Sequence, residues 1–315
     1  MEVIKQIAVE PSTAFAGTSL TEPTAAWSSA TTYAIGAKVS YGFRLFQSLA
    51  ASNLNNIPPS GTASYQDDPL PTAWWVFIGP DNTAAMFDFK GNTASTAVTS
   101  FYSRWTLSTP IEAIAVLNVN AVTIQLKVRD NTLAGAVVYD QTKGVADVSI
   151  GDWYDYFFLP VLTTITQIIF DGIPPPVLGN TNYYELIVTG ATGATVSVGS
   201  VIGGPKYYLG ITQYGISTGI ISYSKKTVDD YGNVKITKRA FAKRMEGDIE
   251  IANADVSRVQ ALMYSLRDVA CVWIGKQDDA RLQELIIVYG YYKDFSTKIT
   301  YPAHSLMSLQ IEGLI

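Results

Sequence analysis

The sequence predicts a mainly β, multi-domain protein, and three observations lead to this fold class. Short runs such as Ala121–Val128 alternate polar and apolar residues between Gly, Pro, Asn or Asp residues, as is typical of strands. Helical periodicity is strong in one segment, Asp255–Val269. The chain has 315 residues, which exceeds the roughly 100–200 residues of one domain.

Two breaks in this pattern divide the chain. Gly79-Pro80 follows the pair Trp74-Trp75, and Gly203-Gly204-Pro205 interrupts a later strand pattern. We therefore expect an N-terminal arm (1–23), a small β module (24–80), a β-sandwich (81–204) and an α+β unit built as a β-sandwich or barrel with one flanking helix (205–315).

Charged residues are scarce and unevenly distributed. They make up 16% of the chain, whereas about 25% is average. Residues 1–200 hold 8 Lys and Arg against 15 Asp and Glu, and residues 201–315 hold 14 against 12. The two portions therefore meet different surroundings. A hydrophobic content of 48% excludes global disorder, and a net charge of −5 argues against a protein that wraps nucleic acid.

The module 24–80 carries the most specific local pattern. Trp27, Tyr33, Gly36, Val39 and Tyr41 have the spacing W-x5-Y-x2-G-x2-V-x-Y. We expect two strands here, at Lys38–Tyr41 and Arg44–Ser48. An Asn-rich loop and the tryptophan pair follow them.

This segment resembles the small chitin-binding type of carbohydrate-binding module of families 5 and 12. The resemblance implies that exposed aromatic residues contact glycan, at Trp27, Tyr33 and one of Trp74 or Trp75. Sugar rings present C–H faces that stack on flat aromatic side chains, which gives this implication a physical basis.

The same aromatic residues also fit a core. A module of about 50 residues has little core to spare, so Trp27, Tyr33 and Trp75 equally suit its interior. The sequence departs from the family pattern at Phe46, where Tyr is more common, and in the insertion Ser60–Leu70. Glycan binding and a docking or decoration role therefore both remain open for the module.

The segment 81–204 predicts a sandwich with no assigned chemistry. Its pattern looks like a jelly-roll or galactose-binding type of sandwich, which implies no function. The block GDWYDYFFLP at 151–160 is interpreted as a strand with a polar rim, and a binding edge is the alternative. Pro174–Pro176 predict an extended connection.

The segment 205–315 begins with a basic hairpin. Strands are expected at Ser222–Thr227 and Val234–Arg239, around a turn at 229–233. The residues that we assign to assembly through this hairpin are Ser222, Lys225, Asp230, Gly232, Lys235 and Lys238. A strand near Met245–Ile251, the helix and three further strands follow, at Cys271–Gly275, Leu285–Tyr292 and Ser305–Ile311.

This order of elements resembles phage tail-tube and distal-tail proteins. The stretches KRAFAKRM, CVWIG and YGYYKDFS look like a family of uncharacterised phage and prophage tail proteins. The resemblance implies a virion subunit of the tail tip or baseplate, which forms a homo-oligomeric ring and contacts other tail proteins. Unpaired hairpin edges would be covered by pairing in such a ring.

Several classes of site are not expected. His304 and Cys271 are the single His and Cys, so a catalytic triad, a metal cluster or a disulfide framework is unsupported. Phosphate-binding and calcium-binding motifs are absent from the sequence. We therefore expect no enzyme activity, no metal and no cofactor. We also expect no specific nucleic-acid binding.

The expected function is a structural subunit of a bacteriophage tail, which displays the module outward. The alternative is an adhesion protein that recognises host cell-surface glycan. The start of the sequence has no apolar signal-peptide core, and no window predicts a membrane helix. The chain is thus expected to be made in the host cytoplasm, without membrane insertion, and to reside in the virion tail.

Overall fold

The structure is a computed structural model, and it confirms the mainly β fold class with several antiparallel sheets. It describes residues 1–9, 14–59, 68–145, 153–158, 166–177, 179–228, 232–239, 241–275, 285–299 and 301–314. The chain forms two compact units. Unit 1 comprises Met1–Gln6 and Gly204–Ile315, and unit 2 comprises Ile7–Gly203.

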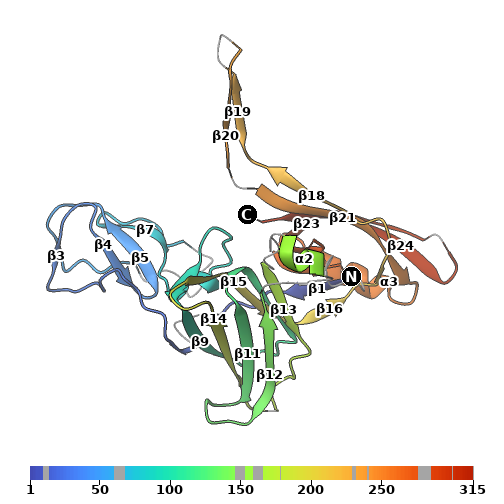
Figure 1. The fold of residues 1–315 in the computed structure, drawn as a ribbon, viewed down its shortest axis with the longest axis horizontal. Helices are drawn as coiled ribbons and strands as arrows, with labels where there is room; N and C mark the ends of the chain where they lie inside the picture. Colours follow the sequence, from blue (N-terminus) through green and yellow to red (C-terminus); the bar gives the residue numbers. More distant parts are fainter. Residues whose placement is uncertain are drawn as a thin grey trace. The chain divides into compact units, whose positions relative to one another are not determined.

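Residues 24–80 form two small sheets in unit 2 (Figure 1). The first has three strands in the order β4-β5-β7, and the second pairs β3 with β6. Their bounds are β3 Thr32–Tyr33, β4 Lys38–Tyr41, β5 Arg44–Ser48, β6 Asn53–Leu54 and β7 Trp75–Pro80. The two strands predicted from the sequence are therefore confirmed as β4 and β5.

The β4–β5 turn shows how the backbone fixes this sheet. Gly42 and Phe43 have φ angles of 57° and 63°, and a two-residue hairpin with positive φ at both positions is a type I′ turn. Glycine adopts this conformation freely, but a bulky residue such as Phe43 rarely does. The Phe43 ring packs edge-on against Phe15, at 5.6 Å between ring centroids, which offsets part of the strain.

The remainder of unit 2 is a sandwich of two antiparallel sheets. One has the order β12-β11-β14-β9-β2 and the other the order β13-β10-β15-β8. Their strands are β2 Phe15–Thr18, β8 Ser95–Val98, β9 Ser100–Leu107, β10 Ala113–Asn120, β11 Thr123–Asp130, β12 Val137–Gly144, β13 Gln167–Asp171, β14 Asn182–Thr189 and β15 Thr195–Gly204. Alternating apolar residues form the core, and Trp105 stacks on Tyr184 within it, at 5.7 Å between ring centroids.

The strand interpretation of Trp153–Phe158 is wrong, because these residues form a short helix, α2. The run is aromatic at consecutive positions and lacks the polar–apolar alternation of a half-buried strand. In a helix, residues four apart share a face, and Trp153 and Phe157 do stack at 6.3 Å with an interplanar angle of 18°. The Trp153 side chain is 79% exposed.

The segment expected as an N-terminal arm supplies a strand to each unit, through residues 1–9 and 14–23. β1, Glu2–Lys5, pairs with β16 and β22 of unit 1. β2 pairs with β9 in the sandwich. Val3 and Ile4 are fully buried, so the apolar residues of this segment are used inside a sheet.

Unit 1 is built on an eight-stranded sheet in the order β16-β1-β22-β23-β24-β21-β17, with β18 also paired to β21. The remaining bounds are β16 Lys206–Tyr208, β17 Ile211–Thr212, β18 Ser217–Ser222, β21 Phe241–Ala252, β22 Cys271–Ile274, β23 Ile287–Lys298 and β24 His304–Gly313. The strands β21 to β24 overlap the four segments that the sequence predicted, although β21 begins four residues earlier and β23 ends six residues later than expected.

One helix, α3 Val256–Ser265, packs on this sheet through Val259 and Met263. It ends four residues earlier than predicted. The N–H of Leu266 bonds to carbonyls of the last helical turn, and Asp268 has a φ of 60°, which ends the helical path.

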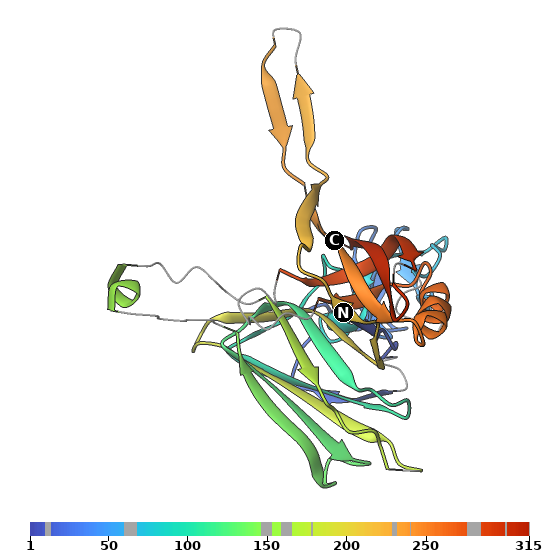
Figure 2. The same cartoon turned by 90° about the vertical axis from the view of Figure 1, so that its right-hand side faces the viewer.

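The predicted basic hairpin is present and extends from the edge of unit 1. Figures 1 and 2 show strands β19 Lys225–Val228 and β20 Val234–Thr237 continuing beyond β18 and β21. Every residue of both strands is exposed. These two strands form a sheet of their own.

Candidate functional site

Six aromatic residues of the 24–80 module form its small core together with Val39. Trp75, Phe46 and Val39 are buried, and four partly buried residues pack around them: Trp27, Tyr33, Tyr41 and Phe77. The rings meet edge to face, with Tyr33 at 5.4 Å from Trp75 and Trp27 at 5.6 Å from Tyr41 between centroids. Such contacts stabilise a core beyond the area that they bury.

Trp74 and Trp75 have opposite environments. Trp75 is fully buried, and its indole Nε1 donates a hydrogen bond of 2.8 Å to the carbonyl of Asn56. The Trp74 side chain is 40% exposed. The Thr72 hydroxyl accepts from both backbone N–H groups, at 3.3 Å from Trp74 and 3.0 Å from Trp75. The turn at Thr72 therefore sends one indole inward and leaves the other at the surface.

The backbone below Trp74 is held in place by polar contacts. Its carbonyl accepts from the Leu49 N–H at 2.8 Å and from the Asn53 side chain at 3.3 Å. Asn53 is buried and also donates to the Ser48 hydroxyl, while its own oxygen accepts from Asn56 at 2.8 Å. Trp74 is thus an exposed ring on a preorganised support.

The four aromatic residues predicted from the sequence therefore divide into two groups. Trp27, Tyr33 and Trp75 belong to the core, where the Tyr33 hydroxyl accepts a hydrogen bond of 2.7 Å from the N–H of Ser28. Trp27 Nε1 is buried and has no hydrogen-bond partner among the described residues. Of the four, Trp74 is the one with an exposed side chain.

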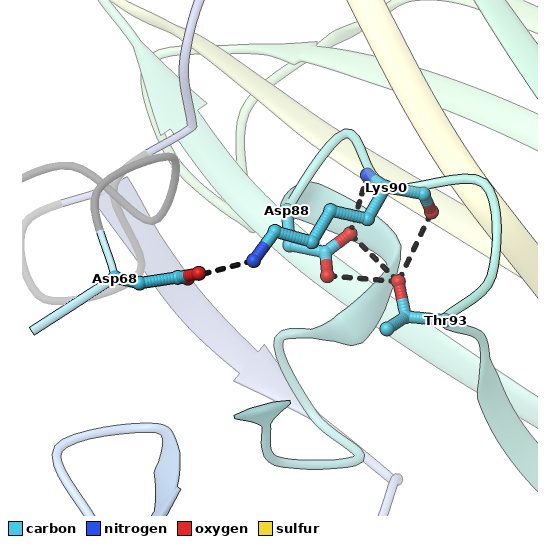
Figure 3. A network of polar contacts seen from close by, with 4 residues as sticks. All are labelled: Asp68, Asp88, Lys90 and Thr93. Atoms are coloured by element: carbon cyan, nitrogen blue, oxygen red, sulfur yellow. Dashed lines mark hydrogen bonds and ion pairs between the residues drawn. The ribbon is translucent and has the colours of Figure 1, made fainter. Parts of the chain in front are cut away.

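A polar network that sequence reasoning missed follows the short helix η1, Ala85–Phe87 (Figure 3). The Asp88 carboxylate accepts from the Lys90 N–H at 2.9 Å and from the Thr93 hydroxyl at 2.8 Å. The Lys90 ammonium reaches Asp68 at 2.7 Å and lies 5.7 Å from the centroid of the Phe77 ring. The network therefore ties the loop after η1 to the module.

Burial raises the pKa of Asp88, while hydrogen bonds from Lys90 and Thr93 oppose that rise. Residues 68 and 90 are far apart in the sequence, and neither belongs to a recognisable motif. The sequence offered no signal for this pair beyond its opposite charges.

The hairpin residues predicted for assembly lie on the projecting arm or at its base. Lys225 and Lys235 are in β19 and β20, Ser222 ends β18, and Gly232 has a φ of 82° in the connection. Lys238 follows β20, and its side chain is exposed. Asp230 lies outside the described residues.

The register gives the arm two different faces. Val228 faces Val234 across the pair, and Ile236 is two residues further along β20, so these three share one face. Lys226 pairs with Ile236 on this first face, so that face carries three apolar side chains and one lysine. The opposite face carries two lysines, Lys225 and Lys235, and two threonines.

The comparisons with known proteins include a partial likeness to a solved structure. No family model matches the chain, and no curated protein matches its sequence. The chain is similar in part to the crystal structure of chitosan-binding module 1 of a chitosanase/glucanase from Paenibacillus sp. IK-5. That likeness has 12% sequence identity and a TM-score of 0.25, and it covers 39% of this chain and 84% of the module. A phage tail family is not supported by these matches.

Cys271 and His304, which the sequence did not favour as functional residues, have the following environments in the structure. Burial raises the pKa of the Cys271 thiol to about 12, which disfavours the nucleophilic thiolate. His304 Nδ1 lies 3.3 Å from a Glu250 oxygen, a neighbour that sequence spacing did not reveal. Among the described residues, no group of three His, Cys, Asp or Glu is placed to hold a metal. In the same residues, no helix is long and apolar enough to cross a membrane.

Proposed function

We propose that the chain is a carbohydrate-binding adhesion protein, whose 24–80 module contacts glycan through Trp74. The exposed indole on a rigid support carries this proposal, because a flat ring held at a surface stacks on the C–H face of a sugar. The side-chain amides of Asn53 and Asn56 form hydrogen bonds within the module and hold the support of this ring in place.

Replacing Trp74 with Ala tests the proposal. Binding to a glycan array should fall at least about fivefold, because the loss of one stacking ring removes about 1–3 kcal/mol. The thermal melting temperature should change little, because the ring is not part of the core cluster. The measurement pairs array binding with melting of the same preparation.

Two variants serve as controls. Trp153→Ala removes a more exposed indole from α2 and should leave glycan binding unchanged. Trp75→Ala should lower the melting temperature, because it empties the module core. Unchanged glycan binding in Trp74→Ala would refute the proposal.

A second role, self-assembly, is favoured by the β19–β20 arm. An isolated two-stranded hairpin is marginally stable in water, and the apolar side chains of Val228, Val234 and Ile236 are exposed. A second copy can supply the complement to the basic face, because Glu246 and Asp248 lie exposed on one face of β21. A heterologous contact between the arm of one copy and the acidic face of β21 in the next forms a ring when the rotation between the copies closes.

A bacteriophage tail tip or baseplate is the setting that we propose for such a ring. Virion mass spectrometry and imaging of the intact particle, with a label at the N-terminus, would test this placement. Absence of the chain from purified virions would contradict it.

Sedimentation of variants tests the assembly role. Ile236→Ser with Val234→Ser should convert a discrete oligomer to monomer, because the apolar face is lost. Thr237→Ser changes the opposite face conservatively and should retain the oligomer. Added salt should weaken association by screening the basic face. A wild-type chain that stays monomeric at high concentration would contradict the proposal.

A further inference from the structure

Unit 2 contains an open cleft of about 850 Å³, which is separate from Trp74. Its walls come from the stretches 19–24, 80–85 and 93–100, with Leu45 and Thr195 completing the lining. This volume lies within the range of about 300–1,000 Å³ that is typical of small-molecule sites.

The walls of the cleft are joined through one residue, Asn82. Its backbone N–H donates to Glu22 at 2.6 Å, and its side chain donates to the carbonyls of Thr21 at 3.0 Å and Thr96 at 2.8 Å. The Thr96 N–H returns a bond of 2.8 Å to the Asn82 oxygen. The shape of the cleft is thus held in place before a ligand arrives, which lowers the ordering cost of binding.

The lining is polar and acidic. Hydroxyl groups come from Ser and Thr residues of the 19–24 and 93–100 walls and from Thr195, and carboxyl groups come from Glu22 and Asp81. Among the described residues that line the cleft, none is basic and none is aromatic. Unit 2 as a whole has 7 Lys and Arg against 14 Asp and Glu, a net charge of −7.

The two carboxyl groups interact electrostatically. Burial raises the pKa of Asp81, hydrogen bonds from Thr83 and Ala84 oppose the rise, and the charge of Glu22 adds to it. A cation between these two groups would relieve their repulsion.

We propose that this cleft binds a saccharide unit that carries a protonated amine. Sugar hydroxyls match the Ser, Thr and Asn groups of the walls, and the ammonium supplies the charge that the lining lacks. An N-acetylated sugar of the same length is neutral, so the cleft discriminates by charge. The proposal is independent of stacking on Trp74, which recognises a ring face instead of an amine.

Calorimetric titration of the full-length chain tests the proposal, with a glucosamine hexamer and an N-acetylglucosamine hexamer as probes. The glucosamine hexamer should bind more tightly. Asp81→Asn should weaken its binding about fivefold, because the buried Asp81 carboxyl loses its charge while Glu22 keeps its own. The three hydrogen bonds to Asp81 all reach Oδ1, which Asn retains, so the fold of the turn is preserved. Asp140→Asn makes the same charge change outside the cleft and should have no effect.

Two variants that place opposite charges at Val98 separate an electrostatic effect on binding from an effect of misfolding. Val98 lines the cleft and its side chain is 67% exposed, so either charge is tolerated there. Val98→Lys should abolish the preference for the amine, and Val98→Glu should keep or increase it. Equal affinity of the wild type for both hexamers would overturn the proposal, as would identical behaviour of the two Val98 variants. Trp74→Ala should leave the amine preference intact, which separates this site from the module.

Discussion

Trp74 and Trp75 are adjacent in the sequence, but only a single backbone step decides which of them can meet a ligand. Trp75 is the first residue of β7 and Trp74 lies in the bend before it, so one indole faces the module core and the other faces solvent. The sequence predicted that one of the two is exposed but not which one, because a tryptophan pair is consistent with either residue being buried. The hydrogen bond from Trp75 Nε1 to Asn56 holds Trp75 as the buried member of the pair.

Asp88 provides a prediction at the same scale. Burial raises its pKa above the ordinary value of 3.8, so ionisation costs more in the folded chain than in the unfolded chain. The stability contributed by the protonated carboxyl is full below about pH 3.8 and is lost as pH rises through the raised folded value. Asp88→Asn does not titrate, so its stability relative to the wild type should be greater at pH 7 than at pH 4.

Urea unfolding of both proteins at the two pH values measures this difference. Asn can accept from the Lys90 N–H and donate to the Thr93 hydroxyl, so the network is kept. Asp140→Asn is an exposed control. A variant advantage that grows on acidification would contradict the assigned cause.

At the scale of elements, the four-residue strand β1 stabilises the sheet of unit 1. It lies between β16 and β22, and Val3 and Ile4 are fully buried. Deleting residues 1–6 should therefore expose the edges of both neighbours and destabilise unit 1, while unit 2 keeps its stability. Hydrogen exchange of the intact and deleted chains checks this, with faster exchange expected in β16 and β22. Uniform loss of protection in both units would contradict it.

The elements also show where sequence patterns succeed. Strands β4 and β5 and helix α3 were predictable, because alternation and a 3.6-residue period report directly which side is buried. Helix α2 was not, because six consecutive residues rich in aromatic side chains fit either element. A 3.6-residue pattern predicts a helix only where apolar residues mark its buried face, and Trp153 of α2 is apolar but exposed.

For the whole molecule, the composition and the two-residue alternation of polar and apolar residues predicted the β fold class. They did not predict which strands pair in the same sheet. β1 and β22 are neighbours through a register that joins Val3 to Trp273, and local patterns carry no information on such distant pairs. The cleft was likewise invisible, because Asn82 connects Thr21, Glu22 and Thr96 only after folding. The sequence did predict that either Trp74 or Trp75 contacts glycan, but it did not show which of the two is exposed.

The path of the chain makes unit 2 an insertion between β1 and β16. It leaves unit 1 after Gln6 and returns at Gly204, and a hydrogen bond of 2.8 Å from the Ile7 N–H to the Gly203 carbonyl brings the two junctions together. During synthesis, unit 2 is complete while most of the sheet of unit 1 is still to be made. Because its ends meet at one point, unit 2 has the geometry of an inserted domain that another domain could replace without altering the sheet that receives it.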